Sequence, residues 1–390
     1  MRPFSRRGIL QLCLLVFAVL LLDPAARATQ PLNQPLKTKN VVFVMTDGLR
    51  WEEVFRGAEQ KLISKAPGGV KDIYVQPLKH EFDRPTTEAR REVLFPFLWK
   101  TVARQGQLFG NQDKGSAVRV TNGKYFSYPG YAETLCGFAD PWADSNAKRL
   151  NPNQTVLEWL YRKPRFEGKI AAFGAWDVFP YILNRERCGF YINAGYEPML
   201  EGEVTPQVAI LNVLKQEVPR HWPGEPFDAL TFHTAREYFR LHEPRVFYLS
   251  LGESDEWAHE GRYDEYLWSA HRIDGYVENL WHMLQANPRY RDQTTLIYSP
   301  DHGRGHGPVG WKSHSDKFPG SENIWIAVLG PDTPPLGERS HIPPVTQSQI
   351  AATLARFMGE NYCAAVPKAG KPIEDVFPRE SRATNESANR

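Results

Sequence analysis

Three strongly apolar segments of this chain end in side chains that can hold a metal ion. The segments and the residues that follow them are 41–45 before Asp47, 246–251 before Asp255 and His259, and 295–298 before Asp301 and His302. Continuous apolar runs of this length are typical of parallel strands buried on both faces. Open α/β sheets bind ligands beyond the carboxyl ends of such strands. The sequence therefore predicts one polynuclear metal site at a sheet edge.

Apolar segments alternate with segments of helical periodicity along most of the chain. The first of the three strands above is expected at 40–46. We expect further strands at 169–175 and 323–329, and helices at 93–105, 155–161, 227–241, 261–286 and 346–358. Such alternation builds a mainly parallel sheet sandwiched between helices. The chain has 390 residues and 42% are hydrophobic, enough for one large α/β domain. We place that domain at residues 29–367.

Three regions depart from this alternation. Residues 57–92 are polar and rich in charge, which predicts an insertion or lid rather than core. Residues 178–226 contain Gly, Pro and Cys with few clear periods, which predicts a small cap-like insertion. Residues 368–390 are polar, so we expect a flexible tail.

The first 28 residues have the parts of a signal peptide: a basic start, an apolar stretch over 9–22 and a small-x-small cleavage site at 26–28. We therefore expect a periplasmic or secreted protein. Residues 5–10 (SRRGIL) also resemble a twin-arginine signal, and a plain secretory signal is the alternative. The apolar stretch is short for a membrane span, so we expect no span in the mature chain.

Charge and cysteine content narrow the function further. The formal net charge is +2 and no basic block occurs, which argues against binding to duplex nucleic acid. Beyond the signal peptide the cysteines are Cys136, Cys188 and Cys363. Three cysteines allow at most one intramolecular disulfide, so either one disulfide or three thiols is expected.

Each candidate ligand has an ordinary alternative when taken alone. Asp47 suits a helix N-cap, Asp255 and His259 suit a charged loop, and Asp301-His302-Gly303 suits a plain turn. Asp and His at three separate strand ends favour a shared metal site instead. Asp255 and His259 are four residues apart, which places them on one face if the segment is helical. His306 and His314 follow in a glycine-rich loop.

A serine that lies between Asp47 and Asp255 in the sequence is a candidate nucleophile. Ser127 lies in residues 126–130 (FSYPG), a turn-like setting. Two metal ions about 3.5–4 Å apart clamp the attacking and leaving oxygens of an in-line displacement at phosphorus. Ser127 then suits a metal-activated nucleophile, and a plain turn serine is the alternative.

In the order of these motifs, from about residue 40 to 360, the chain resembles the alkaline phosphatase superfamily. Residues 126–131 are similar to the nucleophile turn of its nucleotide pyrophosphatase/phosphodiesterase branch. The resemblance implies a metal hydrolase domain with two zinc ions, manganese or another divalent ion being possible. It implies one ion held by Asp255, His259 and His314, and the other by Asp47, Asp301 and His302, with Ser127 bound to it or bridging.

The chain also departs from the family patterns. No Arg follows Ser127 closely, unlike in sulfatases and in alkaline phosphatase proper, and Gly130 stands where the diesterase branch has Asn. The preference between monoesters and diesters therefore stays open. The candidates for the missing substrate contact are Lys124, Asn111, Asn122 and Lys312.

These features predict an exported, metal-dependent hydrolase of small phosphate esters, with a phospho-enzyme formed on Ser127. Two alternatives remain. The first is a sulfate or phosphonate ester hydrolase on the same core. The second is a non-catalytic, metal-containing protein that binds anionic cell-surface or glycan ligands. The sequence leaves the natural substrate and the oligomeric state open.

Overall fold

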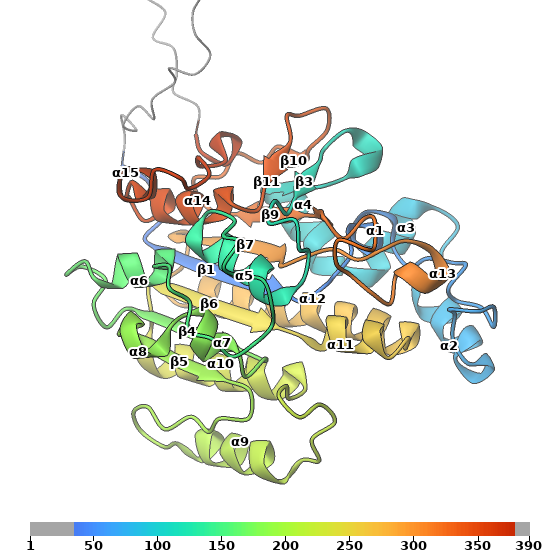
Figure 1. The fold of residues 1–390 in the computed structure, drawn as a ribbon, viewed down its shortest axis with the longest axis horizontal. Helices are drawn as coiled ribbons and strands as arrows, with labels where there is room; N and C mark the ends of the chain where they lie inside the picture. Colours follow the sequence, from blue (N-terminus) through green and yellow to red (C-terminus); the bar gives the residue numbers. More distant parts are fainter. Residues whose placement is uncertain (1–34, 379–390) are drawn as a thin grey trace, which may run out of the picture. The chain divides into compact units, whose positions relative to one another are not determined.

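An eight-stranded sheet lies at the centre of residues 35–378, the part of the chain that the computed structural model describes (Figure 1). Its strands are β1 (Asn40–Thr46), β2 (Gln107–Phe109), β4 (Ile170–Gly174), β5 (Tyr191–Ala194), β6 (Val246–Leu251), β7 (Thr294–Pro300), β9 (Ile326–Leu329) and β10 (Gly337–Glu338). Their order is β10-β2-β9-β7-β1-β6-β4-β5. The neighbours from β7 to β5 run parallel, whereas β9 is antiparallel to β7 and β2. The predicted mainly parallel sheet is therefore confirmed.

The register of the central strands brings the three predicted ligand segments level. Thr46 at the end of β1 pairs with Leu251 at the end of β6 and with Pro300 at the end of β7. The residues that follow these ends therefore start from one edge of the sheet.

Helices cover both faces of this sheet. Alternate residues of β1 enter two separate hydrophobic clusters, Val42 and Val44 on one face and Val41 and Phe43 on the other. The first face is covered by α1 (Trp51–Arg56), α2 (Asp72–Phe82), α3 (Thr87–Leu94), α10 (Asp228–His242) and α12 (Tyr263–Ala286). The second is covered by α5 (Ser127–Cys136), α6 (Val156–Tyr161), α7 (Phe179–Ile182) and α14 (Gln349–Phe357). The sandwich expected from the alternation is confirmed.

The remaining elements are short or peripheral. They are the π-helical turn η2 (Leu98–Val102), α4 (Ala103–Gln105), η3 (Gln112–Lys114), β3 (Val118–Arg119), α8 (Arg185–Cys188), α9 (Pro206–Glu217), α11 (Glu253–His259), α13 (Gly307–Gly310), β8 (Asn323–Ile324), β11 (Val345–Thr346), α15 (Tyr362–Ala365) and η4 (Glu374–Val376). Strands β11, β3 and β8 form a second, three-stranded sheet.

Two expected elements are divided. The strand expected at 323–329 splits into β8 and β9, which belong to different sheets. The helix expected at 93–105 is interrupted at Phe95, directly after α3 ends, since Pro96 restricts the residue before it and cannot donate a backbone hydrogen bond; helical structure then continues through η2 and α4 to Gln105. The buried carboxylate of Asp274 then accepts the N–H groups of Phe97 and Leu98 at 2.7 and 3.0 Å.

The expectation that 57–92 stands outside the core is wrong. Leu62, Val70, Val75 and Leu78 are buried and belong to the hydrophobic cluster of the first face. Charged residues dominate the composition of this region, but α2 buries its apolar residues on one face, and Leu62 and Val70 are buried in the segment before α2.

Two further boundaries differ from expectation. Within 178–226, β5 is the edge strand of the large sheet, so only part of this range can be an insertion. Within the expected tail, Ile373, Val376 and Phe377 are buried against the second face. Residues 379–390 lie outside the described residues, as does the predicted signal peptide at 1–28.

The described cysteines are unpaired: Cys136 and Cys188 are buried thiols and Cys363 is a half-buried one. The three-thiol alternative is therefore the observed one. Between residues 35 and 378, none of the helices combines the length and apolar character that crossing a membrane requires.

Candidate metal centre

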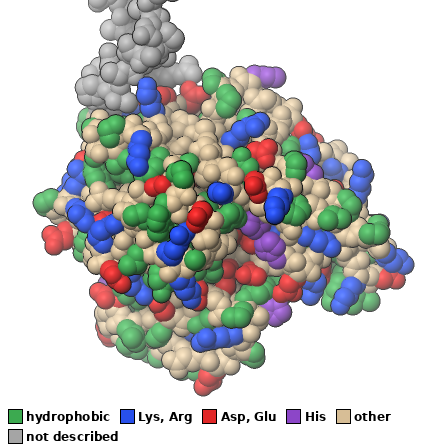
Figure 2. Space-filling model, viewed as in Figure 1, with side chains coloured by type: hydrophobic (Ala, Val, Ile, Leu, Met, Phe, Trp, Pro, Cys, Tyr) green, Lys and Arg blue, Asp and Glu red, His purple; other side chains and the backbone are tan. Residues whose placement is uncertain are grey.

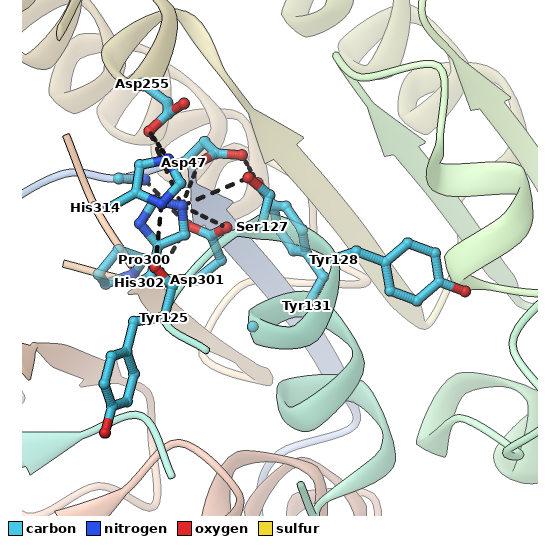
Figure 3. A network of polar contacts seen from close by, with 12 residues as sticks. Asp47, Tyr125, Ser127, Tyr128, Tyr131, Asp255, Pro300, Asp301, His302 and His314 are labelled. Atoms are coloured by element: carbon cyan, nitrogen blue, oxygen red, sulfur yellow. Dashed lines mark hydrogen bonds and ion pairs between the residues drawn. The ribbon is translucent and has the colours of Figure 1, made fainter. Parts of the chain in front are cut away.

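The carboxylates and imidazoles that follow β1, β6 and β7 point toward one another (Figure 3). His302 lies at the middle of this group. Its Nε2 is 3.1 Å from Asp47 Oδ1, 3.5 Å from Asp301 Oδ2 and 3.9 Å from Asp255 Oδ1. Histidine and acidic side chains also gather around a hollow on the face shown in Figure 2. The predicted convergence at one sheet edge is therefore present, and metal binding by these residues stays a prediction.

The first group consists of Asp47, Asp301 and His302, all buried. Asp301 is held by its Oδ1, which accepts the N–H groups of Gly48 at 3.0 Å and His302 at 2.8 Å. The Nδ1 of His302 lies 2.8 Å from the Gly303 carbonyl, to which it donates its proton. In a neutral imidazole this leaves a lone pair on Nε2, directed at the carboxylates.

The second group consists of Asp255, His259 and His314. Asp255 and His259 lie one turn apart on α11, and His259 Nε2 is 3.0 Å from Asp255 Oδ2. His259 Nε2 is 2.9 Å from His314 Nε2. His314 Nδ1 donates to the carbonyl of Tyr125 at 3.1 Å, which fixes the ring orientation. Ligand atoms of His302 also lie within reach of Asp255 and His314, so His302 stands between the two groups.

Burial shifts the pKa values of the side chains in the centre. It raises the pKa of Asp47 and Asp301 well above the usual carboxyl range, and repulsion from Asp255 adds to the effect on Asp47, as repulsion from Asp47 does on Asp301. Burial also lowers the pKa of His302 to about 4, so its imidazole is neutral. For Asp255, burial opposes ionisation, but the positive charge of Arg304 and the neighbouring histidines hold its pKa well below the usual range.

These side chains fit divalent cations. Asp47 Oδ1 and Asp301 Oδ2 are buried without a hydrogen-bond partner among the described residues, and the lone pair of His302 faces both. Electron pairs that face one another in a buried site repel unless a cation lies between them. Mixed carboxylate and imidazole donors suit zinc and related divalent ions. The described residues offer two sets of such ligand atoms, one from Asp47, Asp301 and His302 and one from Asp255, His302 and His314, and the two sets share His302.

Ser127 is the first residue of α5 rather than part of a plain turn. Its Oγ is buried and lies 3.5 Å from His302 Nε2. One turn later on the same helix face, the hydroxyl of Tyr131 donates to Asp47 Oδ2 at 3.1 Å and accepts from Ser250 at 3.0 Å. Sequence reasoning missed Tyr131, although its four-residue spacing from Ser127 would have indicated it once the segment was recognised as helical.

Arg304 was also missed. It is buried and its Nη1 contacts Asp255 Oδ1, while Nε donates to the Trp311 carbonyl at 2.8 Å and Nη2 to the Lys312 carbonyl at 2.7 Å. Arg304 thereby ties the loop that carries His314 to Asp255. Arg304 directly follows the Asp301-His302-Gly303 motif, and this position was the available signal. A sequence does not show, however, which way an arginine side chain points.

The predicted substrate-contact residues differ in their surroundings. Lys124 is exposed. Asn111 is engaged elsewhere, since its amide donates to Glu338 at 2.6 Å and its Oδ1 accepts the N–H of Asp113. The side-chain amide of Asn122 is buried beside the carboxylate of Glu133, which also accepts the backbone N–H of Asn122 at 2.9 Å.

Lys312 and Gly130 each have a close neighbour, and His306 has an acidic partner. The Nζ of Lys312 lies against Gly261. A Cβ on Gly130 would come within 2.4 Å of the Asp301 carbonyl oxygen. An asparagine, as in the diesterase branch, would therefore not fit at Gly130 without a backbone shift. His306 pairs with Glu52 at 2.6 Å.

We expect Gly48→Ala to lower metal content and thermal stability. Gly48 has a φ of +58°, and an added Cβ would lie 2.5 Å from Asp255 Oδ1 and 2.7 Å from Arg304 Nη1. The side chains it would displace are Asp255, a predicted ligand, and Arg304, which contacts Asp255. Gly168→Ala is the matched control, because Gly168 has a φ of +66° with nothing within 4 Å of the added Cβ. Equal metal content in the two variants, by elemental analysis, would contradict the expectation.

No protein-family model and no curated protein matches the sequence. Solved structures do match. The alkaline phosphatase PafA is 11% identical with a TM-score of 0.58, over 89% of this chain and 100% of that one. The lipoteichoic acid synthase LtaP from Listeria monocytogenes is 12% identical with a TM-score of 0.53, over 85% and 76%. The phosphonate monoester hydrolase SpPMH from Silicibacter pomeroyi is 14% identical with a TM-score of 0.50, over 88% and 78%.

Proposed function

We propose that this chain, whose fold is that of the alkaline phosphatase superfamily, is a metal-dependent hydrolase of phosphate esters. The observation that carries the proposal is the position of the Ser127 hydroxyl, 3.5 Å from the imidazole nitrogen that the clustered carboxylates face. A hydroxyl beside a two-cation centre is the arrangement that in-line phosphoryl transfer needs.

In this proposal Asp255, His259 and His314 hold one ion, and Asp47, Asp301 and His302 hold the other. When bound, the ions supply Lewis-acid stabilisation of negative charge on the phosphoryl oxygens and on the serine oxygen. Zinc is the metal that we propose, because the donors are carboxylates and imidazoles. The carbonyls of Gly303 and Tyr125 orient His302 and His314 for this purpose.

The chain's own groups then position the reaction. Ser127 Oγ attacks phosphorus, the ester oxygen leaves on the opposite side, and a phosphoseryl enzyme forms that water later hydrolyses. Near the start of α5, Tyr128 N donates to Asn146 and Gly130 N to the Phe126 carbonyl, so neither amide is free for a phosphoryl oxygen.

Comparing three substrates tests the proposal. On protein of known zinc content, we expect kcat/KM for nitrophenyl phosphate or bis-nitrophenyl phosphate to exceed that for nitrophenyl sulfate by at least about a hundredfold, roughly 3 kcal/mol. Preference for the sulfate ester would indicate a sulfate ester hydrolase. Full zinc content without turnover of any of the three would favour a binding protein and overturn the proposal.

We also propose that the protein is exported through residues 1–28 and acts in the periplasm or outside the cell. The proposal rests on the basic start, the apolar stretch and the small-x-small site.

A further inference from the structure

A cavity of about 550 Å³ lies at the ends of β4 and β5. Both strands are parallel to β6, so the cavity opens at the sheet edge that carries Asp255. Asp177 follows β4 and Tyr196 follows β5, and both line it. A volume of this size is typical of pockets that take a small organic group.

The cavity is joined to the nucleophile on one side. Tyr128, next to Ser127, points away from the metal-binding side chains (Figure 3). Its hydroxyl donates to the Arg149 carbonyl at 2.7 Å, and its N–H donates to Asn146 at 3.0 Å. These contacts anchor the loop that brings Lys148 to the cavity wall.

On the other side, residues 222–225 separate the cavity from the metal centre. The hydroxyl of Tyr196 donates to the carbonyls of Trp222 at 3.2 Å and Glu225 at 3.1 Å. Glu225 turns its carboxylate away from the cavity and toward Gly252, at the start of the helix that carries Asp255. The cavity is therefore linked to Ser127 through Tyr128 and its loop, and to the helix that carries Asp255 through residues 222–225.

The wall of the cavity is polar and balanced in charge. It contains three basic and three acidic side chains. Lys148 pairs with Asp177 at 2.7 Å. Arg185 pairs with Glu197 through two contacts of 2.7 and 2.6 Å. Each pair carries no net charge, but its remaining carboxylate lone pairs and N–H groups can accept and donate hydrogen bonds at the wall.

Two further charged side chains remain available to a ligand. Arg220 lies over the ring of Tyr196, 4.4 Å from its centroid, and makes no hydrogen bond or ion pair with a residue in the described range. Glu186 is exposed at the rim and is likewise without an ion pair there. One free donor group and one free acceptor group thus face the cavity beside a tyrosine ring.

We propose that this cavity binds an uncharged, hydroxyl-rich group, a glycosyl or polyol unit, on the leaving side of the ester. The role of this unit as part of an ester rests on the proposed function, whereas its binding in the cavity does not. Hydroxyls both donate and accept, which matches a wall that carries basic and acidic side chains in equal number. An acyl chain would leave these polar groups unsatisfied, and a polyanion would meet as many acidic as basic groups.

Binding is tested without catalysis. Saturation-transfer NMR on the zinc-loaded full chain would use the methyl glycosides of glucose, galactose and mannose at millimolar concentration. We expect saturation of at least one glycoside, reduced at least fivefold in Arg220→Ala and in Glu186→Ala. Arg104→Ala is the matched control, because Arg104 is exposed on α4 and has no polar partner among the residues described. Absence of transfer to all three glycosides, or equal transfer in all variants, would overturn the inference.

A kinetic comparison connects this site to the reaction. We expect kcat/KM for the 6-phosphate of the glycoside that binds to exceed that for ethyl phosphate at least tenfold. Arg220→Ala should lower this ratio, and Arg104→Ala should not. Glycoside binding without hydrolysis of any phosphate ester would sink the proposed function and leave this site standing. Hydrolysis of ethyl phosphate with no glycoside binding would do the reverse.

Discussion

Replacing Ser127 by alanine is expected to lower kcat on the best phosphate ester by at least about a thousandfold, as losses of enzyme nucleophiles do. The Ser127 Oγ is the nucleophile of the proposed reaction and lies 3.5 Å from His302 Nε2. The substitution leaves the carboxylates and imidazoles of the centre unchanged, so metal content should stay near two ions per chain. Steady-state rates and elemental analysis of the same preparation would measure both quantities.

Ser269→Ala supplies the control for this variant. Ser269 is also buried, and its hydroxyl donates to the Tyr266 carbonyl within α12, so the substitution likewise removes one buried hydroxyl. We expect its rate to remain within about threefold of the parent, since most substitutions away from a reacting group have small effects. Unchanged turnover in Ser127→Ala would refute the nucleophile assignment, and loss of metal in that variant would mean that Ser127 is needed as a ligand.

Removing the metal with a strong chelator is expected to abolish turnover and to lower the melting temperature, and added zinc should restore both. Ions that bind only the folded chain contribute about 4 kcal/mol to its stability at a thousandfold excess over Kd. Without them, Asp47 and Asp301 remain buried beside each other with oxygens that lack a hydrogen-bond partner among the described residues. Calorimetry before and after chelation would measure the loss. An unaffected rate would remove the metal from the mechanism.

The pH dependence of the chelated protein provides an internal check. Burial raises the pKa of Asp47 and Asp301 in the folded chain. Their contribution to stability is therefore fully present below the unfolded carboxyl pKa of about 4, and it is lost as the pH rises through the folded pKa. The chelated protein should unfold at a higher temperature at pH 5 than at pH 8. The zinc-loaded protein should show the opposite trend, because acid protonates its ligands.

The strands and the position of the site could be predicted from the sequence for a simple reason. Buried parallel strands need continuous apolar runs, and such runs are visible in 41–45, 246–251 and 295–298. Parallel strands end at one edge, so the polar residues after those runs had to approach one another. The four-residue spacing of Asp255 and His259 likewise predicted a shared helix face, which α11 provides.

The regions that were wrongly predicted share a different property. In 57–92 and in 368–390, a few apolar residues lie among many polar and charged ones, and composition hides their burial. In 323–329, one apolar run serves two sheets, because the chain changes partners at Trp325. Pairing partners of this kind lie far away in the sequence, so the run alone does not indicate where it divides.

The sequence by itself determined an α/β sandwich with Asp and His side chains at one edge of a parallel sheet, because apolar periodicity is a local property that each segment carries alone. Only the tertiary structure decided how that edge works. The hydrogen bond from Tyr131 to Asp47, the contact of Arg304 with Asp255 and the charge-balanced cavity around Tyr196 all join residues from separate elements. Such contacts depend on the direction in which each side chain points after packing, and packing involves the whole chain at once.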